Sequence, residues 1–288
     1  MRWSSSGRGN IDDERATSGG GFPAVPLGIG GFIVVALLSM YTGIDFFSLL
    51  GGGQANAPSS TVGTSGHVTA SPTEEKMVDF VNAVAEDVQS TWENVFGGRY
   101  QRTRVTLFRD QIQSACGFAQ SATGPFYCPG DHKVYLDLGF FDELQRRFGA
   151  PGDFAQAYVL AHEFGHHIQA LTGTESQLRQ AQRDNPSSTN ALSVRLELQA
   201  DCYAGVWGHA ASQSGRAAQG KVELDPGDVD EGLRAAAAIG DDRLQKMATG
   251  RVMPERFTHG SSEQRVTWFK RGLERGDPRA CDTFSTTR

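Results

Sequence analysis

The stretch from residue 157 to residue 168, AYVLAHEFGHHI, contains a His-Glu-x-x-His pattern within a run of apolar residues. The apolar residues recur at helical spacing, so we expect an α-helix inside the protein. Residues four apart project from one face of a helix, which lets His162 and His166 direct ring nitrogens at a single Zn²⁺. Glu163 would then act as the general base toward a zinc-bound water. The alternative is a buried histidine pair held only by hydrogen bonds.

A catalytic zinc needs a third protein ligand, and the chain after this helix limits what that ligand can be. Gln169 and Thr172 stand where an extended motif would carry a glycine and a third histidine, so we expect a carboxylate. Glu197 lies in a segment with few charges, where a carboxylate is costly unless a cation receives it. We predict that Glu197 is the third ligand, with an ion pair to Arg195 or Arg179 as the alternative.

Asp201 follows Glu197 by one helical turn and would face the same side of a second helix. A carboxylate in such a position accepts the N–H of a ligand histidine and fixes its tautomer. We therefore predict that Asp201 supports a histidine ligand without binding the metal.

The His-Glu-x-x-His and Glu-x-x-x-Asp patterns together resemble the gluzincin branch of zinc peptidases. Further short sequence segments narrow the resemblance to the bacterial, membrane-anchored neutral zinc metallopeptidase (YpfJ-like) family, and the similarity spans almost the whole chain. The resemblance implies a zincin-like domain with one Zn²⁺ per chain and a protein or peptide substrate, but no particular substrate. The segments that carry the resemblance are Met1–Trp3, Ala155–Tyr158, Glu197–Gly205, His259–Arg265 and Cys281–Phe284.

Composition fits one catalytic domain with appendages. Of the 288 residues, 39% are hydrophobic and 21% are charged, which is ordinary for a globular chain that can bury a core. The net charge is -6, and the chain has no basic patch or aromatic-interleaved run of Lys and Arg. These features argue against a nucleic-acid partner.

The first part of the chain predicts a membrane anchor. An uncharged apolar stretch begins at residue 27 and, after Asp45, continues to residue 50, which is long enough to cross a bilayer. Three arginines precede it and no Lys or Arg follows until Lys76, so the positive-inside rule places the N-terminus in the cytoplasm. A buried core helix is the alternative, and the anchor is expected to stay uncleaved. The expected parts are a disordered cytoplasmic tail (1–25), a transmembrane anchor in the lipid bilayer (26–50), a flexible linker (51–73) and an extracytoplasmic catalytic domain (74–288).

The chain has four cysteines, an even number in a domain expected to lie outside the cytoplasm. Disulfides are typical of that compartment. Cys116 and Cys128 would close a short loop, which leaves Cys202 to pair with Cys281 beside the predicted Glu197 helix. Cysteine zinc ligands are the alternative, but no C-x-x-C spacing supports them.

The coarse secondary structure predicts an α+β fold, mainly helical with a small sheet, preceded by one transmembrane helix. We expect 134–137 to form the sheet edge along the cleft, where an extended substrate would add as a further strand. Strands are expected at 103–108 and 133–138, and helices at 74–96, 140–148, 153–171, 175–183, 191–211, 228–247 and 261–273.

The chemistry these residues favour is hydrolysis of peptide bonds by a zinc peptidase with Glu163 as the catalytic base. A further donor should stabilise the oxyanion; His259 competes for this role with Tyr135, Tyr158 and Tyr203. His167 lies off the ligand face and is expected to be structural. The alternatives are a zinc amidohydrolase acting on a cell-envelope substrate and a non-catalytic zinc-containing scaffold.

Overall fold

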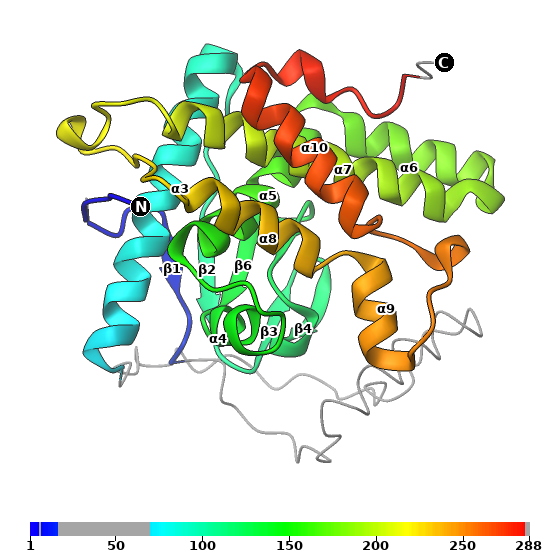
Figure 1. Cartoon of the computed structure of the whole chain (residues 1–288), viewed down its shortest axis with the longest axis horizontal. Helices are drawn as coiled ribbons and strands as arrows, with labels where there is room; N and C mark the ends of the chain where they lie inside the picture. Colours follow the sequence, from blue (N-terminus) through cyan, green and yellow to red (C-terminus); the bar gives the residue numbers. More distant parts are fainter. Residues whose placement is uncertain (6, 17–69, 286–288) are drawn as a thin grey trace, which may run out of the picture.

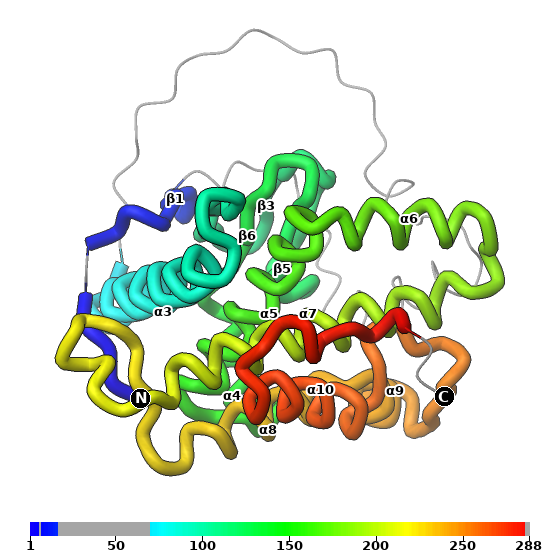
Figure 2. Tube along the Cα trace, turned by 90° about the horizontal axis from the view of Figure 1, so that it is seen from above, coloured from blue at the N-terminus to red at the C-terminus, as the bar shows by residue number. Residues whose placement is uncertain are grey.

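The computed structural model describes residues 1–5, 7–16 and 70–285, and these are mainly helical with small sheets, so the predicted α+β class is confirmed. Figures 1 and 2 show α5 and α7 between two layers: the sheet with α3 on one side, and α8 with α10 on the other. The helices are α3 Pro72–Phe96, α4 Gly139–Arg146, α5 Asp153–Thr172, α6 Thr174–Asp184, α7 Thr189–Ala211, α8 Asp228–Ala238, α9 Asp241–Thr249 and α10 Ser262–Arg275.

The larger sheet has the strand order β1-β2-β6-β5. Strand β2 (Val105–Phe108) is central and buried along its length, and it pairs in parallel with β1 (Ile11–Asp13) and with β6 (Lys133–Asp137). Strand β5 (Phe126–Cys128) runs antiparallel to β6. Strands β3 Gln111–Ser114 and β4 Gly117–Gln120 form a separate hairpin.

The prediction that 134–137 forms the sheet edge at the cleft is wrong. Strand β6 lies between β2 and β5, so β5 is the edge strand that packs against α5. The reason is that the segment leading to Cys128 forms a short strand, β5. This strand pairs with β6 on the side away from β2 and so becomes the edge of the sheet. An alternating pattern marks a strand but does not say which neighbours it acquires.

Residues 1–5 and 7–16 belong to the folded domain, in contrast to the disordered tail predicted over 1–25. Strand β1 hydrogen-bonds to β2, and Trp3 packs edge-on against Phe80 of α3 at 5.5 Å between ring centroids. The arginines of this segment pair with acidic groups. These pairs are Arg2 with Glu223 and Asp225, Arg8 with Glu75 and Asp79, and Arg15 with Asp13, Glu74 and Glu75.

The predicted anchor over 26–50 lies outside the described residues, as does the linker up to residue 69. Among the described residues, no helix combines the length and the apolar character that crossing a bilayer requires.

Three glycines let the helices around α5 approach each other closely. A Cβ at Gly165 would lie 2.9 Å from the Cα of Ala200, so α5 and α7 pack backbone to backbone. A Cβ at Gly205 would lie 2.1 Å from the Phe269 carbonyl oxygen, and one at Gly272 would lie 1.9 Å from that of Cys202. These close approaches bring α5, α7 and α10 near enough for their side chains to share one site.

The predicted helix over 228–247 is two helices, α8 and α9, which meet at Gly240. A Cβ at Gly240 would lie 2.3 Å from the backbone nitrogen of Ser262, so the chain bends where the loop before α10 crosses it. Helix α10 begins with a capping box formed by Ser261 and Gln264.

Both predicted disulfides are confirmed. Cys116 is bonded to Cys128, which joins the β3–β4 hairpin to β5. Cys202 of α7 is bonded to Cys281, which fixes the C-terminal segment against that helix. No cysteine is free among the described residues.

Candidate metal centre

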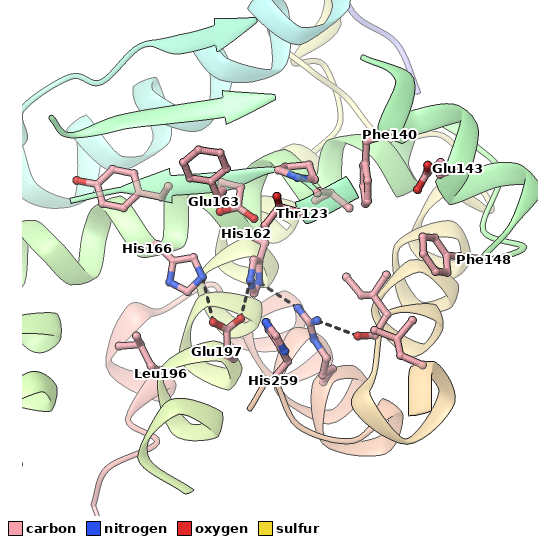
Figure 3. A pocket seen from close by; sticks show the side chains of 18 of the residues that line it. Thr123, Phe140, Glu143, Phe148, His162, Glu163, His166, Leu196, Glu197 and His259 are labelled. Atoms are coloured by element: carbon pink, nitrogen blue, oxygen red, sulfur yellow. Dashed lines mark hydrogen bonds and ion pairs between the residues drawn. The ribbon is translucent and has the colours of Figure 1, made fainter. Parts of the chain in front are cut away.

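Helices α5 and α7 bring His162, His166 and Glu197 together, as the sequence predicted. The Nε2 atom of His162 lies 3.1 Å from one carboxylate oxygen of Glu197, and the Nε2 atom of His166 lies 3.6 Å from the other. One ligand atom from each residue lies within 4.8 Å of the other two. Figure 3 shows both imidazoles directed at the carboxylate. The two histidines come from one helical face, and Glu197 comes from the neighbouring helix.

The electrostatics of this trio suit a bound cation. Burial lowers the pKa of His162, but Asp201 and Glu197 outweigh it and raise that pKa to about 9. Burial likewise opposes the effect of Glu197 on His166, whose pKa is nevertheless raised. Burial raises the pKa of Glu197, but the histidines hold that pKa well below its usual range. Two imidazole nitrogens and a carboxylate form a donor set that zinc accepts, so the residues present fit the metal.

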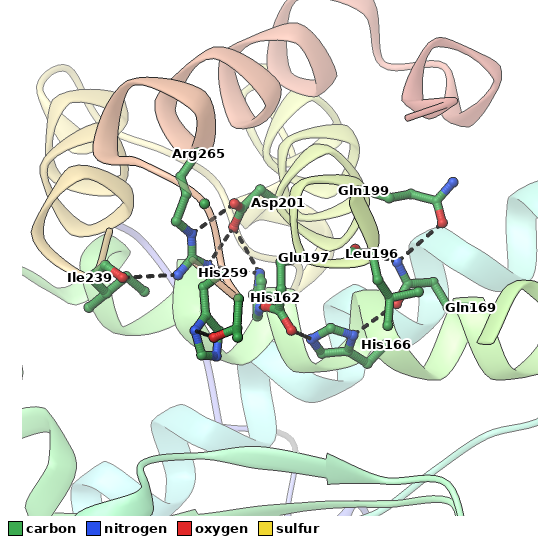
Figure 4. Close-up of polar contacts among 12 residues, drawn as sticks. His162, His166, Gln169, Leu196, Glu197, Gln199, Asp201, Ile239, His259 and Arg265 are labelled. Carbon is green, nitrogen blue, oxygen red and sulfur yellow. Dashed lines mark hydrogen bonds and ion pairs between the residues drawn. The ribbon is translucent and has the colours of Figure 1, made fainter. Parts of the chain in front are cut away.

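Asp201 supports His162 at the nitrogen that faces away from Glu197. Its Oδ1 accepts hydrogen bonds from the Nδ1 of His162 at 2.8 Å and from the hydroxyl of Tyr158 at 2.5 Å. Arg265 donates to both carboxylate oxygens at 2.9 Å, and Asp201 is fully buried. Burial raises the pKa of Asp201, but Arg265 and His162 bring it down to about 2. Asp201 is therefore charged and fixes the His162 tautomer with Nε2 facing Glu197 (Figure 4).

Sequence reasoning missed two residues of this site. Arg265 is almost fully buried, and its signal was its position on the α10 face that also carries Phe269 and Gly272. Gln169 follows His166 by three residues and accepts its Nδ1 hydrogen bond at 2.8 Å. A glutamine within a mostly apolar helix, one turn after a predicted ligand, was the available signal.

Glu163 lies on α5 between the two histidines and lines the same cleft. Its side chain is buried, with 7% of the residue exposed. Burial raises the pKa of Glu163, while the nearby imidazoles act in the opposite direction. A raised carboxyl pKa favours a group that must both accept and deliver a proton near neutral pH.

The cleft in front of the trio has a volume of about 550 Å³. One wall is β5 and the loop before it, and other parts of the lining come from α4, from α9 and from Ile239, which follows α8. Away from the ligands the cleft is lined by apolar side chains together with Glu143 and Arg147, and Figure 3 shows Phe140, Glu143 and Phe148 at that end. The apolar lining there consists of Phe140, Phe148, Val159, Ile239 and Leu244.

His259 is the predicted oxyanion donor that the structure places in the cleft. Its Nδ1 lies 3.3 Å from Asp241, and its side chain is 52% exposed. Asp241 also accepts the backbone N–H groups of Thr258, His259 and Gly260, so one carboxylate fixes the loop and the ring. Partial desolvation of the ring lowers the pKa of His259, but Glu197 and Asp241 outweigh this effect and raise that pKa.

The three competing tyrosines do not line the cleft. Tyr158 donates its hydroxyl to Asp201, Tyr135 donates its hydroxyl to Asp131, and Tyr203 packs against Trp92. His167 is buried and bonds the Gln101 carbonyl oxygen and the Tyr127 hydroxyl, which places it behind the cleft wall.

A second acidic cluster, Asp153 with Asp228 and Glu231, lies among α5 and α8. The α-amino group of Met1 lies 3.3 Å from Asp153 and 3.2 Å from Asp228. The cluster therefore already faces a cation of the chain itself, and it holds the first residue against the start of α5.

The site combines two imidazoles from one helix, a carboxylate from a neighbouring helix and a buried glutamate in an open cleft. This combination of residues is typical of a mononuclear zinc hydrolase. The family model described as "Putative neutral zinc metallopeptidase" matches residues 1–284, and the chain belongs to this family.

Two bacterial relatives illustrate the extent of the similarity. "Uncharacterized protein YpfJ" of Escherichia coli strain K12 is 44% identical over 296 residues, which cover 99% of each chain. "Uncharacterized protein Rv2575" of Mycobacterium tuberculosis strain H37Rv is 46% identical over 209 residues, which cover 71% of this chain and 70% of its own. No solved structure matches the chain.

Proposed function

We propose that this protein is a zinc-dependent peptidase that hydrolyses peptide bonds in protein or peptide substrates. The observation that carries the proposal is the convergence of His162, His166 and Glu197 beside Glu163 in one open cleft. The family to which the chain belongs supports the zinc and the peptide substrate.

His162, His166 and Glu197 would hold the metal. A zinc ion bound there supplies Lewis acidity, which lowers the pKa of water and polarises the scissile carbonyl group. Asp201 and Gln169 keep the Nδ1 nitrogens protonated, so that Nε2 is the nitrogen that each ring would give to the metal. Zinc binding would then displace only the Nε2 protons.

Glu163 takes the proton of the attacking water and later delivers a proton to the leaving amine. His259, held by Asp241, donates a hydrogen bond to the oxygen that gains negative charge. The raised pKa of His259 favours its protonated form, in which both ring nitrogens are donors. The edge strand β5 offers backbone groups to an extended peptide along the cleft.

The experiment compares the wild-type protein with Glu163→Gln and Glu197→Ala, measuring metal content and cleavage of a peptide library. Glu163→Gln should keep zinc near one per chain while hydrolysis falls about 10²–10⁴-fold. Glu197→Ala should lose most of the zinc and some stability, because only two imidazoles remain. Chelation of the wild-type protein should abolish cleavage.

Glu143→Gln is the matched control, because Glu143 lines the same cleft near Phe140 and takes no part in the proposed chemistry. It should retain hydrolysis and zinc. Activity retained by Glu163→Gln would show that the metal is structural and would end the peptidase proposal. Cleavage of a cell-envelope amide, with no cleavage of peptides, would favour the amidohydrolase alternative.

We also propose that the catalytic domain lies outside the cytoplasm. The two disulfides support this location, because such bonds persist in oxidising compartments. Residues 1–5 and 7–16 share strand pairing and ion pairs with the domain, so the proposal includes them on the same side of any membrane. This differs from the cytoplasmic N-terminus that the positive-inside rule predicted.

Labelling of intact cells with a membrane-impermeant maleimide tests this location. Ser5→Cys probes the first segment, and Gln213→Cys, also exposed, is the control in the catalytic domain. Both cysteines should react before lysis. Labelling of Gln213→Cys alone would place the two segments on opposite sides, and labelling of neither would place the domain inside.

A further inference from the structure

The second histidine of the trio is held by an amide side chain. The Nδ1 atom of His166 bonds the Oε1 of Gln169 at 2.8 Å, and Gln169 is fully buried. The Nε2 of Gln169 donates to the Leu196 carbonyl oxygen at 2.7 Å and to the Oε1 of Gln199 at 3.1 Å. Because both amide hydrogens have carbonyl acceptors, the amide must present its oxygen to His166.

This bonding pattern fixes the His166 tautomer. An amide oxygen can only accept, so Nδ1 of His166 carries a hydrogen, and Nε2, which faces Glu197, is the nitrogen that a metal would bind. A flipped Gln169 amide would set its oxygen against the oxygens of Leu196 and Gln199. The environment of Gln169 therefore decides how His166 faces the metal position.

Gln199 is the next group in the chain of bonds, and it leads to the second disulfide. Its Nε2 donates to the carbonyl oxygen of Cys281 at 3.0 Å, and only 6% of Gln199 is exposed. Cys281 is held there by its bond to Cys202, three residues after Gln199 on α7. Thr283 adds a hydrogen bond to the Arg195 carbonyl oxygen at 2.6 Å, so the C-terminal segment lies along the helix that carries Glu197.

We propose that Gln169 and Gln199 are positioning residues for His166 and that the Cys202–Cys281 disulfide anchors them. The relay runs from His166 through Gln169 and Gln199 to the Cys281 carbonyl oxygen, and Figure 4 shows its two glutamines beside His166. The inference rests on the proposed function, since it takes His166 to be a zinc ligand. The disulfide, which touches no ligand, then supports metal affinity through two buried side chains.

The test measures the Zn²⁺ affinity of the full chain by competition with a chromophoric chelator, and the visible spectrum of the Co²⁺-substituted protein. Gln169→Ala should weaken Zn²⁺ binding about 10 to 100-fold and alter the Co²⁺ spectrum, as loss of a ligand's hydrogen-bond partner does. Gln199→Ala should act in the same direction with a smaller loss. A purely structural role would lower the melting temperature without changing the spectrum.

The disulfide is tested by replacing Cys202 and Cys281 with alanine. Because the disulfide and Gln199 act in series, this pair combined with Gln199→Ala should lose no more affinity than the larger single effect. Replacing Cys116 and Cys128 is the matched control and should leave Zn²⁺ affinity within about two-fold, a change too small to count as coupling. If the Cys202 and Cys281 variant does not fold, Thr283→Val loosens the same segment with the disulfide intact and should weaken binding.

The outcomes separate the two proposals. A wild-type chain that binds no zinc rejects the proposed function. A wild-type chain that binds zinc, together with Gln169→Ala and Gln199→Ala variants of unchanged affinity and spectrum, overturns the relay alone. Additive losses from Gln199→Ala and the cysteine pair, or unchanged affinity in Thr283→Val, would overturn the anchoring role of the disulfide segment.

Discussion

The two histidines of the candidate metal centre face the same position but are held in different ways. His162 is bound by a buried carboxylate, Asp201, whose charge is balanced by Arg265. His166 is bound by a neutral amide, Gln169, whose donors are taken by carbonyl oxygens. The first support depends on paired charges and the second on matched hydrogen bonds.

The difference shows what each kind of support needs from the fold. A buried carboxylate requires a buried cation, which α10 supplies across a close helix contact. A buried amide requires only neutral acceptors, and these come from α7 and the disulfide-held segment. Losing a partner should therefore cost more on the His162 side, where a charge would be left unpaired.

The largest effect is expected from Arg265→Met. The variant leaves Asp201 charged and fully buried with no cation, which should lower the free energy of unfolding by about 3–5 kcal/mol. Denaturant unfolding of chelator-treated protein measures the change. Arg271→Met, on the exposed face of the same helix, should cost no more than about 1 kcal/mol through its contact with Trp268. Equal losses of unfolding free energy in the two variants would contradict the role given to the buried Arg265–Asp201 pair.

Asp201→Asn should act on both the metal and the fold, because it leaves the buried guanidinium of Arg265 without its counter-charge. The amide keeps the shape and removes the charge that favours the His162 tautomer, so Zn²⁺ affinity or activity should fall about 10 to 100-fold. Chelator competition and peptide hydrolysis measure the loss. Unchanged values would mean that the charge of Asp201 has no role at His162.

Tyr158→Phe removes one of the hydrogen bonds to Asp201 and leaves the contacts from His162 and Arg265. A hydrogen bond to a charged group is worth about 1.5–3 kcal/mol, and the remaining donors should keep the loss of unfolding free energy near about 1–2 kcal/mol. Thermal and denaturant unfolding report it. Tyr203→Phe, a buried tyrosine that takes no part in this network, is the control and should change little.

The smallest effect is expected for a charge pair at the surface. The hydrogen bond from Arg102 lowers the pKa of Glu86 to about 2, below the unfolded value of about 4.3. The pair therefore stabilises the fold above about pH 4.3, and its contribution is lost as the pH falls toward 2. Because both side chains are about 40% exposed, Glu86→Gln should cost under about 1 kcal/mol at pH 6 and nothing near pH 2. A larger loss of unfolding free energy, measured in urea, would show that burial does not explain why this pair contributes less than the Arg265–Asp201 pair.

Much of the candidate site could be predicted because it follows helical spacing. His162 and His166 lie four residues apart, as do Glu197 and Asp201, and the structure brings all four together. Arg265 was missed because its partner Asp201 lies on another helix, and Gln169 was missed because it belongs to neither motif. The order of the strands was missed because β1 pairs with β2 far along the chain and because the short strand β5 was not expected.

The sequence by itself determined the motif helix, the residues able to bind zinc, the disulfide pairs and the α+β class. Each depends on local spacing, on composition or on a small number of pairings. Only the tertiary structure decided which groups support the two histidines, that β5 borders the cleft, and that residues 1–5 and 7–16 pack on the domain. Those arrangements depend on helices meeting at Gly165, Gly205 and Gly272 and on strands paired across long separations, and neither leaves a periodic signal in one chain.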